Sequence, residues 1–249
     1  MSARVDYLSC FILHHRPYSE TSLILDVFSL LHGRLGIMAK GARAGRRGLA
    51  SLLQPVRKLN LAWSGRSELV TLTGAEPDGA PYRLQGRRLL SAFYLNELLL
   101  RLLHRHEPHS DLFQAYEASL VSLAGDVDEE RVLRLFEKHL LQSLGYGLIL
   151  DHEARSGAPV VTDRNYYYYL EHGPEGDRLD AREAVQVSGK TLISLYNEDR
   201  WDRQIAREAK HLLRSIIDSR LDQRPLQSRE LYKAYLNNRA GASGHGNTD

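Results

Sequence analysis

The sequence predicts an α+β fold in which a small closed barrel of five strands precedes an all-helical domain. Up to about residue 75, apolar residues form short runs bounded by turn residues, as in strands. From about residue 87 they recur with the 3.6-residue period of helices. The 249 residues have room for two domains, expected at 1–80 and 81–239, and the polar stretch 240–249 is expected to be a disordered tail.

The N-terminal strands follow one another closely and have few helical signals between them. Arg16-Pro17, His32-Gly33 and Ser64-Gly65 mark turns between the runs. The expected strands are residues 7–15, 22–31, 35–39, 56–63 and 68–73. Five short strands within about 70 residues are typical of the oligonucleotide-binding (OB) barrel. The pattern alone fits an SH3-like barrel equally well.

The sequence after about residue 87 predicts helices separated by one irregular stretch. The first helix is apolar around most of its circumference, which indicates a central, mostly buried position. Asp128 is placed to cap the third helix, and Gly145 ends it. The expected helices are residues 87–105, 110–123, 129–144, 191–197, 202–221 and 229–237. Residues 151–187 are expected to be an irregular insert, in which the tyrosine run 166–169 is better explained as a strand with packed rings than as a base-stacking platform.

Residues 40–48 form a basic, glycine-rich loop between two of the expected strands. The loop holds four cations and three glycines, and no acidic residue lies between Asp26 and Glu68. Such a cluster gains affinity for a polyanion by releasing condensed counterions, and glycine allows a close approach of the backbone. A solvated turn has a similar composition, but the barrel context favours nucleic acid. The expected DNA contacts are Arg34, Lys40, Arg43, Arg46, Arg47, Arg57 and Lys58.

Charge and cysteine content limit the remaining classes. The formal net charge is +2, but residues 1–80 hold ten Lys and Arg against six Asp and Glu, so the positive charge is N-terminal. The single Cys10 allows no disulfide within the chain, which is typical of a reducing cytoplasm. We expect neither a signal peptide nor a membrane span, because no basic segment followed by a long apolar core opens the sequence and no apolar run is long enough to cross a membrane. We expect a cytoplasmic, nucleoid-associated protein.

Motifs of catalysis are missing from the sequence. It has no phosphate-binding loop with a Gly-Lys-Ser/Thr ending, no dinucleotide fingerprint, no His-Glu-x-x-His and no Gly-x-Ser-x-Gly. His14-His15 and His104-x-His106 do not converge on a metal without other ligands. We therefore expect no enzyme. A nucleic-acid-acting enzyme such as a nuclease, and an adaptor that binds acidic proteins, remain as alternatives.

Eight segments along the chain occur in a characteristic order and spacing. They are RPYSETSL at 16–23, GR at 33–34, KGAR at 40–43, LQP at 53–55, YLNEL at 94–98, LGYG at 144–147, SG at 156–157 and SREL at 228–231. Through these segments the sequence resembles the RecO family of bacterial DNA-repair proteins. The resemblance extends to about residue 238 and implies an N-terminal OB barrel followed by a helical domain.

The resemblance implies a recombination mediator of the RecF pathway. Such proteins bind single- and double-stranded DNA, anneal complementary strands, and act with RecR to load RecA onto DNA coated by single-stranded-DNA-binding protein (SSB). Many members also hold a zinc ion in the helical domain with four cysteines. Glu153 and Ser156 stand where the first two thiolates are expected, so we expect no zinc or other cofactor in this chain.

The resemblance also implies contact with the acidic C-terminal tail of SSB on the helical domain. A tail that ends in apolar residues and a carboxylate requires an apolar pocket with a cation at its rim. Arg134, with Leu133 and Phe136 beside it, is the candidate for this contact.

Overall fold

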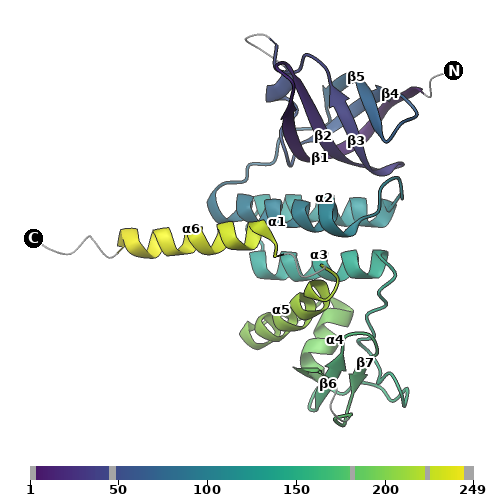
Figure 1. Ribbon diagram of the computed structural model, residues 1–249. Helices are drawn as coiled ribbons and strands as arrows, with labels where there is room; N and C mark the ends of the chain where they lie inside the picture. Colours follow the sequence, from purple (N-terminus) through teal and green to yellow (C-terminus); the bar gives the residue numbers. More distant parts are fainter. Residues whose placement is uncertain (1–3, 45–48, 180–182, 222–224, 244–249) are drawn as a thin grey trace, which may run out of the picture. The chain divides into compact units, whose positions relative to one another are not determined.

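The computed structural model describes residues 4–44, 49–179, 183–221 and 225–243, and its first five strands close into a barrel (Figure 1). These strands are β1 (Arg4–Tyr18), β2 (Ser22–Ser29), β3 (Gly33–Ala39), β4 (Lys58–Ser64) and β5 (Leu69–Pro77). Their order around the barrel is β1-β2-β3-β5-β4, and only β3 and β5 pair in parallel. The predicted five-stranded, OB-like barrel is confirmed.

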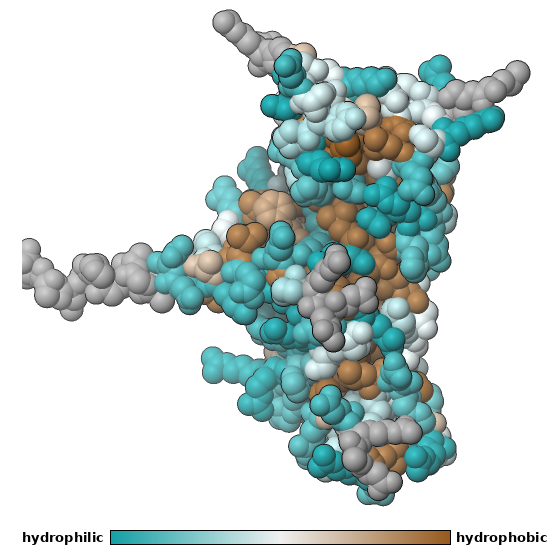
Figure 2. Space-filling model, viewed as in Figure 1, coloured by the Kyte–Doolittle hydropathy of each residue, from teal (hydrophilic) through white to brown (hydrophobic). Residues whose placement is uncertain are grey.

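Alternate positions of the strands fill the barrel. On β2, Leu23, Leu25 and Val27 lie in the barrel core and are at most 3% exposed. Ala42 and Leu53, from the segment between β3 and β4, close the core with 1% and 0% exposure. That segment contains a short 3₁₀ helix at Leu49–Ser51. Figure 2 shows hydrophobic residues that also reach the barrel surface among hydrophilic ones.

After the barrel, the described part of the chain forms six α-helices, each close to its predicted position. They are α1 (Gly86–Leu102), α2 (Ser110–Ala124), α3 (Glu129–Ser143), α4 (Gly189–Asn197), α5 (Arg203–Asp218) and α6 (Gln227–Ser243). Asp128 caps α3 as predicted, because its carboxylate accepts a hydrogen bond from the Glu130 backbone N–H at 2.9 Å. Helix α6 continues through Ser243, four residues into the stretch expected to be a tail.

The chain divides into two compact units. The barrel unit comprises Met1–Asp126 and Leu226–Asp249, and the second unit comprises Val127–Pro225. Helices α1, α2 and α6 therefore belong with the barrel. The change of sequence pattern near residue 80, by contrast, was the basis for an expected domain boundary before α1. The start of α6 is held on α1 by Glu97, whose carboxylate accepts from the backbone N–H of Ser228 at 2.8 Å and from its hydroxyl at 2.5 Å.

A small sheet lies in the second unit, within the insert that was expected to be irregular. It has the order β7-β6-β8, from β6 (Asn165–Tyr169), β7 (Gly173–Glu175) and β8 (Val185–Ser188). Tyr166, Tyr168 and Tyr169 of the central strand are 0%, 2% and 4% exposed. The interpretation of the tyrosine run as a strand with packed rings is confirmed.

Candidate nucleic-acid interface

The basic loop begins with a turn that is fixed to the neighbouring β1–β2 hairpin. The Arg43 backbone N–H donates to the Thr21 carbonyl at 2.7 Å, and the Arg43 guanidinium donates to the Ser19 carbonyl at 3.4 Å. Gly41 has a φ of +66°, a left-handed conformation that glycine adopts without strain. The hairpin end and this turn together form one end of the barrel, which we call the barrel tip (residues 16–22 and 40–44).

Two of the predicted DNA contacts are exposed at the barrel tip. Lys40 and Arg43 both lie on the surface, while Ala42 between them is in the barrel core. No carboxylate within the described part of the chain forms an ion pair with either cation. Arg46 and Arg47, which were predicted to continue this cluster, lie outside the described residues.

Arg34 is tied into the protein rather than presented on the surface. Its Nε donates to the Leu103 carbonyl at 3.2 Å, and its own carbonyl accepts from the His106 backbone N–H at 2.9 Å. Burial lowers the pKa of the Arg34 guanidinium, and the nearby charge of Arg105 lowers it further. Arg105 in turn lies 3.4 Å from a carboxylate oxygen of Asp26. The contacts of Arg34 therefore join β3, and the Arg105–Asp26 ion pair joins β2, to the segment that follows α1.

Lys58 is an ion-paired cation, although the sequence around it contains no acid. Its Nζ is 2.7 Å from the Glu117 carboxylate and 3.6 Å from that of Asp78. Burial opposes its charged form, but the hydrogen bond and charge of Glu117, together with Asp78, raise the pKa of Lys58. Its charge is compensated within the barrel unit. Arg57 beside it is half-buried.

Two exposed residues of the barrel tip were not among the predicted contacts. Arg16 and Tyr18 stand two positions apart near the end of β1, and both are exposed. Residues two apart on a strand point to the same face, so the two side chains share the outer face of the hairpin. The Arg16-Pro17 turn signal placed this segment outside the first strand, whereas β1 continues through Tyr18.

Two common sources of catalytic chemistry are a reactive cysteine and a metal-binding cluster, and the described residues provide neither. Cys10 is fully buried, and burial raises the pKa of its thiol to about 12, so it stays protonated. Among the described residues, no three His, Cys, Asp or Glu side chains form a group that could hold a metal ion. The described residues thus offer no metal cluster to the nuclease alternative.

A polar turn occupies the positions at which the resemblance implies thiolates in zinc-containing family members. The Ser156 hydroxyl donates to the Glu153 carboxylate at 2.8 Å, and the Arg164 guanidinium lies 3.0 Å from the other oxygen of that carboxylate. The Glu153 backbone N–H donates to the Ala158 carbonyl at 2.8 Å and closes the turn. A positive guanidinium and a hydroxyl do not fit the thiolate set of a structural zinc site.

The residues predicted to meet the SSB tail are mostly buried in the second unit. The Arg134 side chain is 7% exposed, and its guanidinium lies 2.6 Å from the buried Glu137 carboxylate. Phe136 is 1% exposed and Leu133 is partly exposed. The structure thus places the three residues on one helix, but it does not present Arg134 as a cation at the rim of a pocket.

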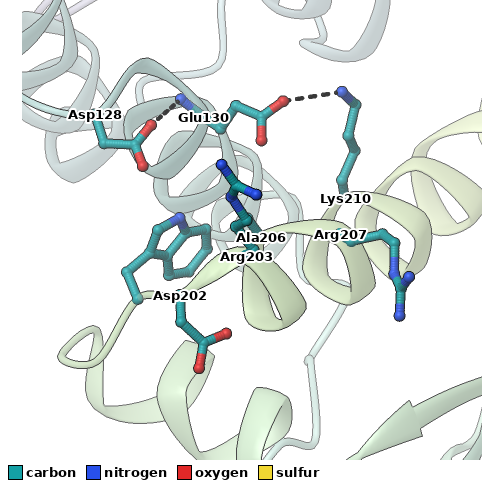
Figure 3. Close-up of a pocket in the computed structure, with 8 residues that line it drawn as sticks. Asp128, Glu130, Asp202, Arg203, Ala206, Arg207 and Lys210 are labelled. Carbon is teal, nitrogen blue, oxygen red and sulfur yellow. Dashed lines mark hydrogen bonds and ion pairs between the residues drawn. The ribbon is translucent and has the colours of Figure 1, made fainter.

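A pocket of about 510 Å³ lies between α3 and α5 of the second unit (Figure 3). Glu130 from α3 and Lys210 from α5 face each other across it, with 3.1 Å between carboxylate and ammonium. Arg203 and Arg207 of α5 also line it and are exposed, and Figure 3 shows Arg203 pointing toward α3. The Trp201 indole N–H is buried there without a hydrogen-bond partner among the described residues.

The closed five-stranded barrel with a basic, glycine-containing end places the chain among OB-like proteins, a class that commonly binds oligonucleotides. Family models for the N-terminal and C-terminal parts of recombination protein O match residues 7–79 and 83–230. The chain belongs to the recombination protein O (RecO) family.

Curated relatives are similar over almost their whole length. The DNA repair protein RecO of Methylococcus capsulatus is 47% identical over 90% of this chain and 91% of its own. The proteins of the same name from Nitrosococcus oceani and Haemophilus influenzae are 46% and 43% identical, over 92% and 89% of this chain and 93% of their own. These relatives support a role in DNA repair and recombination. Within the described part of the chain, no helix has the length and apolar character to cross a membrane.

Proposed function

We propose that the chain is a recombination mediator that binds single- and double-stranded DNA at the barrel tip and anneals complementary strands. The observation that carries this proposal is the exposed pair Lys40 and Arg43, which lies on a turn that the Arg43 backbone N–H fixes to Thr21 of the OB-like barrel. Phosphate contacts contain no base code, so binding is expected to be sequence-tolerant and salt-sensitive. Two strands with screened charges can then pair without ATP.

The contact set is smaller than the one predicted from the sequence. Lys40 and Arg43 form its described part, and Arg46 and Arg47 continue it in the proposal. Lys58 has two carboxylates beside it and Arg34 is tied to the segment after α1, so both are expected to support the barrel more than to bind phosphate. Arg57, which is half-buried near β4, is proposed as a contact at the edge of the site.

Membership in the RecO family supports the wider function. We propose that the protein acts with RecR to load RecA onto SSB-coated DNA, without catalysing a reaction itself, in the cytoplasm at the nucleoid. We also propose that it works without zinc, because Glu153 and Arg164 form an ion pair at the turn where zinc-containing family members are expected to have thiolates. Metal analysis of the purified protein is expected to show less than stoichiometric zinc.

The salt dependence of DNA affinity tests the barrel tip. Each phosphate contact contributes about 0.7 to the slope of log affinity against log salt on single strands. The double variant Lys40→Ala/Arg43→Ala should therefore reduce this slope by about 1.4. Titrating a labelled oligonucleotide at several salt concentrations measures the slope.

The matched control is Lys233→Ala, which removes an exposed cation from α6, where Lys233 pairs with Glu230 at 2.8 Å. This variant should keep the wild-type slope. If the double variant also kept it, the barrel tip would not be the DNA contact. Annealing of SSB-coated complementary strands should slow in the double variant and not in the control.

We propose that the acidic SSB tail binds the pocket between α3 and α5. The buried Trp201 N–H offers a donor to a carboxylate, and Arg203 and Arg207 offer exposed cations at the rim. Arg134 is less suited, because binding there requires its buried ion pair with Glu137 to break. A labelled tail peptide should bind Arg203→Ala/Arg207→Ala at least about tenfold more weakly than wild type, given two charge-assisted hydrogen bonds. Unchanged peptide affinity would place the site elsewhere.

A further inference from the structure

Tyr18 presents a large aromatic ring to solvent at the barrel tip. It is the last residue of β1, and its pairing with Ser22 closes the β1–β2 hairpin. The residue is 48% exposed. Among the described residues, the ring has no stacked aromatic group, no cation over its face and no hydrogen bond to its hydroxyl.

Tyr7, on the same strand, is an exposed tyrosine whose ring has a structural role. Tyr7 is similarly exposed at 50%, but it lies over Gly74 of β5, where a side chain on the glycine would collide with the ring. Tyr7 thus covers the gap that a strand glycine leaves. No glycine lies in such contact with Tyr18 among the described residues, so Tyr18 does not cover a strand glycine as Tyr7 does.

The surroundings of Tyr18 fit a nucleic-acid strand. Antiparallel partners share a face of the sheet, and the outer face beside Tyr18 contains the row Arg16, Ile24 and Met38. In this row Met38 is a partly exposed apolar residue, Ile24 is buried at 8% exposure, and the exposed Arg16 lies at the edge. Lys40 and Arg43 stand on the adjacent turn, which hydrogen bonds fix to residues 19 and 21.

We propose that Tyr18 stacks on an unpaired base of single-stranded DNA whose phosphates lie along Arg16, Lys40 and Arg43. This inference rests on the proposed function of the barrel tip. It adds a residue that distinguishes single-stranded from double-stranded DNA. Aromatic platforms beside cations bind single strands because every base has a face to stack on. In a duplex the base faces are already stacked on their neighbours, so Tyr18 contributes to single-strand binding and not to duplex binding.

This arrangement explains how the barrel tip releases the duplex that annealing forms. A single strand is held by phosphate contacts and by stacking, whereas the duplex formed by annealing keeps only the phosphate contacts. The loss of the Tyr18 contact therefore weakens binding at the moment when strands pair. The ring face is the functional group in this role, and the phenol hydroxyl is not needed.

The test compares three fluorescent probes of equal length: a single-stranded oligonucleotide, its duplex, and a single strand with abasic sites. Tyr18→Ala should weaken binding to the first by about fivefold or more, since one base–aromatic stack accounts for about 5- to 100-fold in affinity. It should leave affinity for the duplex and the abasic strand, and the salt slope, within about twofold of wild type. Tyr18→Phe should behave as wild type and Tyr18→Leu as the alanine variant.

Tyr196→Ala is the matched control, because Tyr196 of α4 is 52% exposed and belongs to the second unit. It should change no affinity. The inference is overturned if Tyr18→Ala binds the normal single strand as wild type does, or if it weakens binding to all three probes equally. Failure of wild type to bind DNA, or an unchanged slope in Lys40→Ala/Arg43→Ala, would instead remove the proposed function and this inference with it.

Discussion

Asn96 of α1 joins three elements of the barrel unit through one buried amide. The register of β1 shifts between Ile12 and His14, so Leu13 forms a bulge. The Asn96 side-chain NH₂ donates to the Leu13 carbonyl at 2.7 Å, and its carbonyl oxygen accepts from the Tyr116 hydroxyl of α2. Because Asn96 is 3% exposed, water cannot replace these bonds easily.

Replacing Asn96 with leucine should reduce the free energy of unfolding by about 2–4 kcal/mol, because it leaves a buried carbonyl and a buried hydroxyl without these partners. Urea denaturation followed by circular dichroism measures the change. Tyr116→Phe removes one hydroxyl at the same site and should cost less, about 1 kcal/mol. Equal stability of Asn96→Leu and wild type would mean that the amide does not stabilise the bulge.

The sequence shows the type and period of such residues but not their partners. Lys40 and Lys58 look alike in the sequence, since both lie in the acid-free stretch of the barrel. Folding brings Glu117, 59 residues away, to Lys58 and leaves Lys40 exposed. The DNA contacts at the tip could thus be predicted as a group, while the separation of free from compensated cations depends on long-range packing.

Among the elements, the end of α4 is held by side chains of α3. Glu198 ends α4 in a left-handed conformation with a φ of +58°. Its carboxylate accepts from Lys138 at 2.6 Å and His139 at 2.8 Å, and its carbonyl accepts from Arg131 at 2.6 Å. Burial opposes the charged form, but the hydrogen bonds and charges of Lys138 and His139 lower the pKa of Glu198 below its ordinary 4.5.

A lowered carboxyl pKa contributes stability that is present above pH 4.5, the ordinary pKa, and is lost as the pH falls through the folded-state value. Glu198→Gln should therefore reduce stability at neutral pH, by no more than about 1 kcal/mol because the carboxylate is partly exposed. It should also weaken the decline of stability below that pKa. Denaturation curves from neutral to acidic pH measure both effects.

Glu171→Gln is the control for this pH series, because Glu171 is exposed and lies 3.9 Å from Arg220. It should keep the wild-type pH dependence. If Glu198→Gln also kept it, the ion pairs at the end of α4 would not contribute to acid sensitivity.

The elements themselves could largely be predicted, with one instructive difference. Helix periods and caps such as Asp128 placed the helices within a few residues. The insert 151–187 gave no clear period, because its strands are three to five residues long and β6 is tyrosine at four consecutive positions. A run of identical residues has no alternation, so its buried and exposed sides become visible only when the sheet is formed.

At the scale of the whole molecule, packing groups the helices differently from the sequence pattern. Phe11 of β1 lies 5.0 Å from Phe113 and 4.8 Å from Tyr116 of α2, between ring centroids. Phe28 of β2 lies 5.4 Å from the same Phe113. Both phenylalanines are fully buried on the outside of the barrel, so α2 covers a surface that the barrel alone exposes to water.

A fragment of residues 1–126 should therefore be markedly more stable than a fragment of residues 1–80. The shorter fragment exposes Phe11 and Phe28, and each buried phenylalanine contributes about 1.5–3 kcal/mol. We expect the longer fragment to melt cooperatively, with a near-ultraviolet circular dichroism signal from its packed rings, and the shorter one to aggregate or to melt at lower temperature. Phe113→Ala in the longer fragment should move its melting temperature toward that of the shorter one. If both fragments melted at the same temperature, the barrel would be an independent domain and the helices only attached to it.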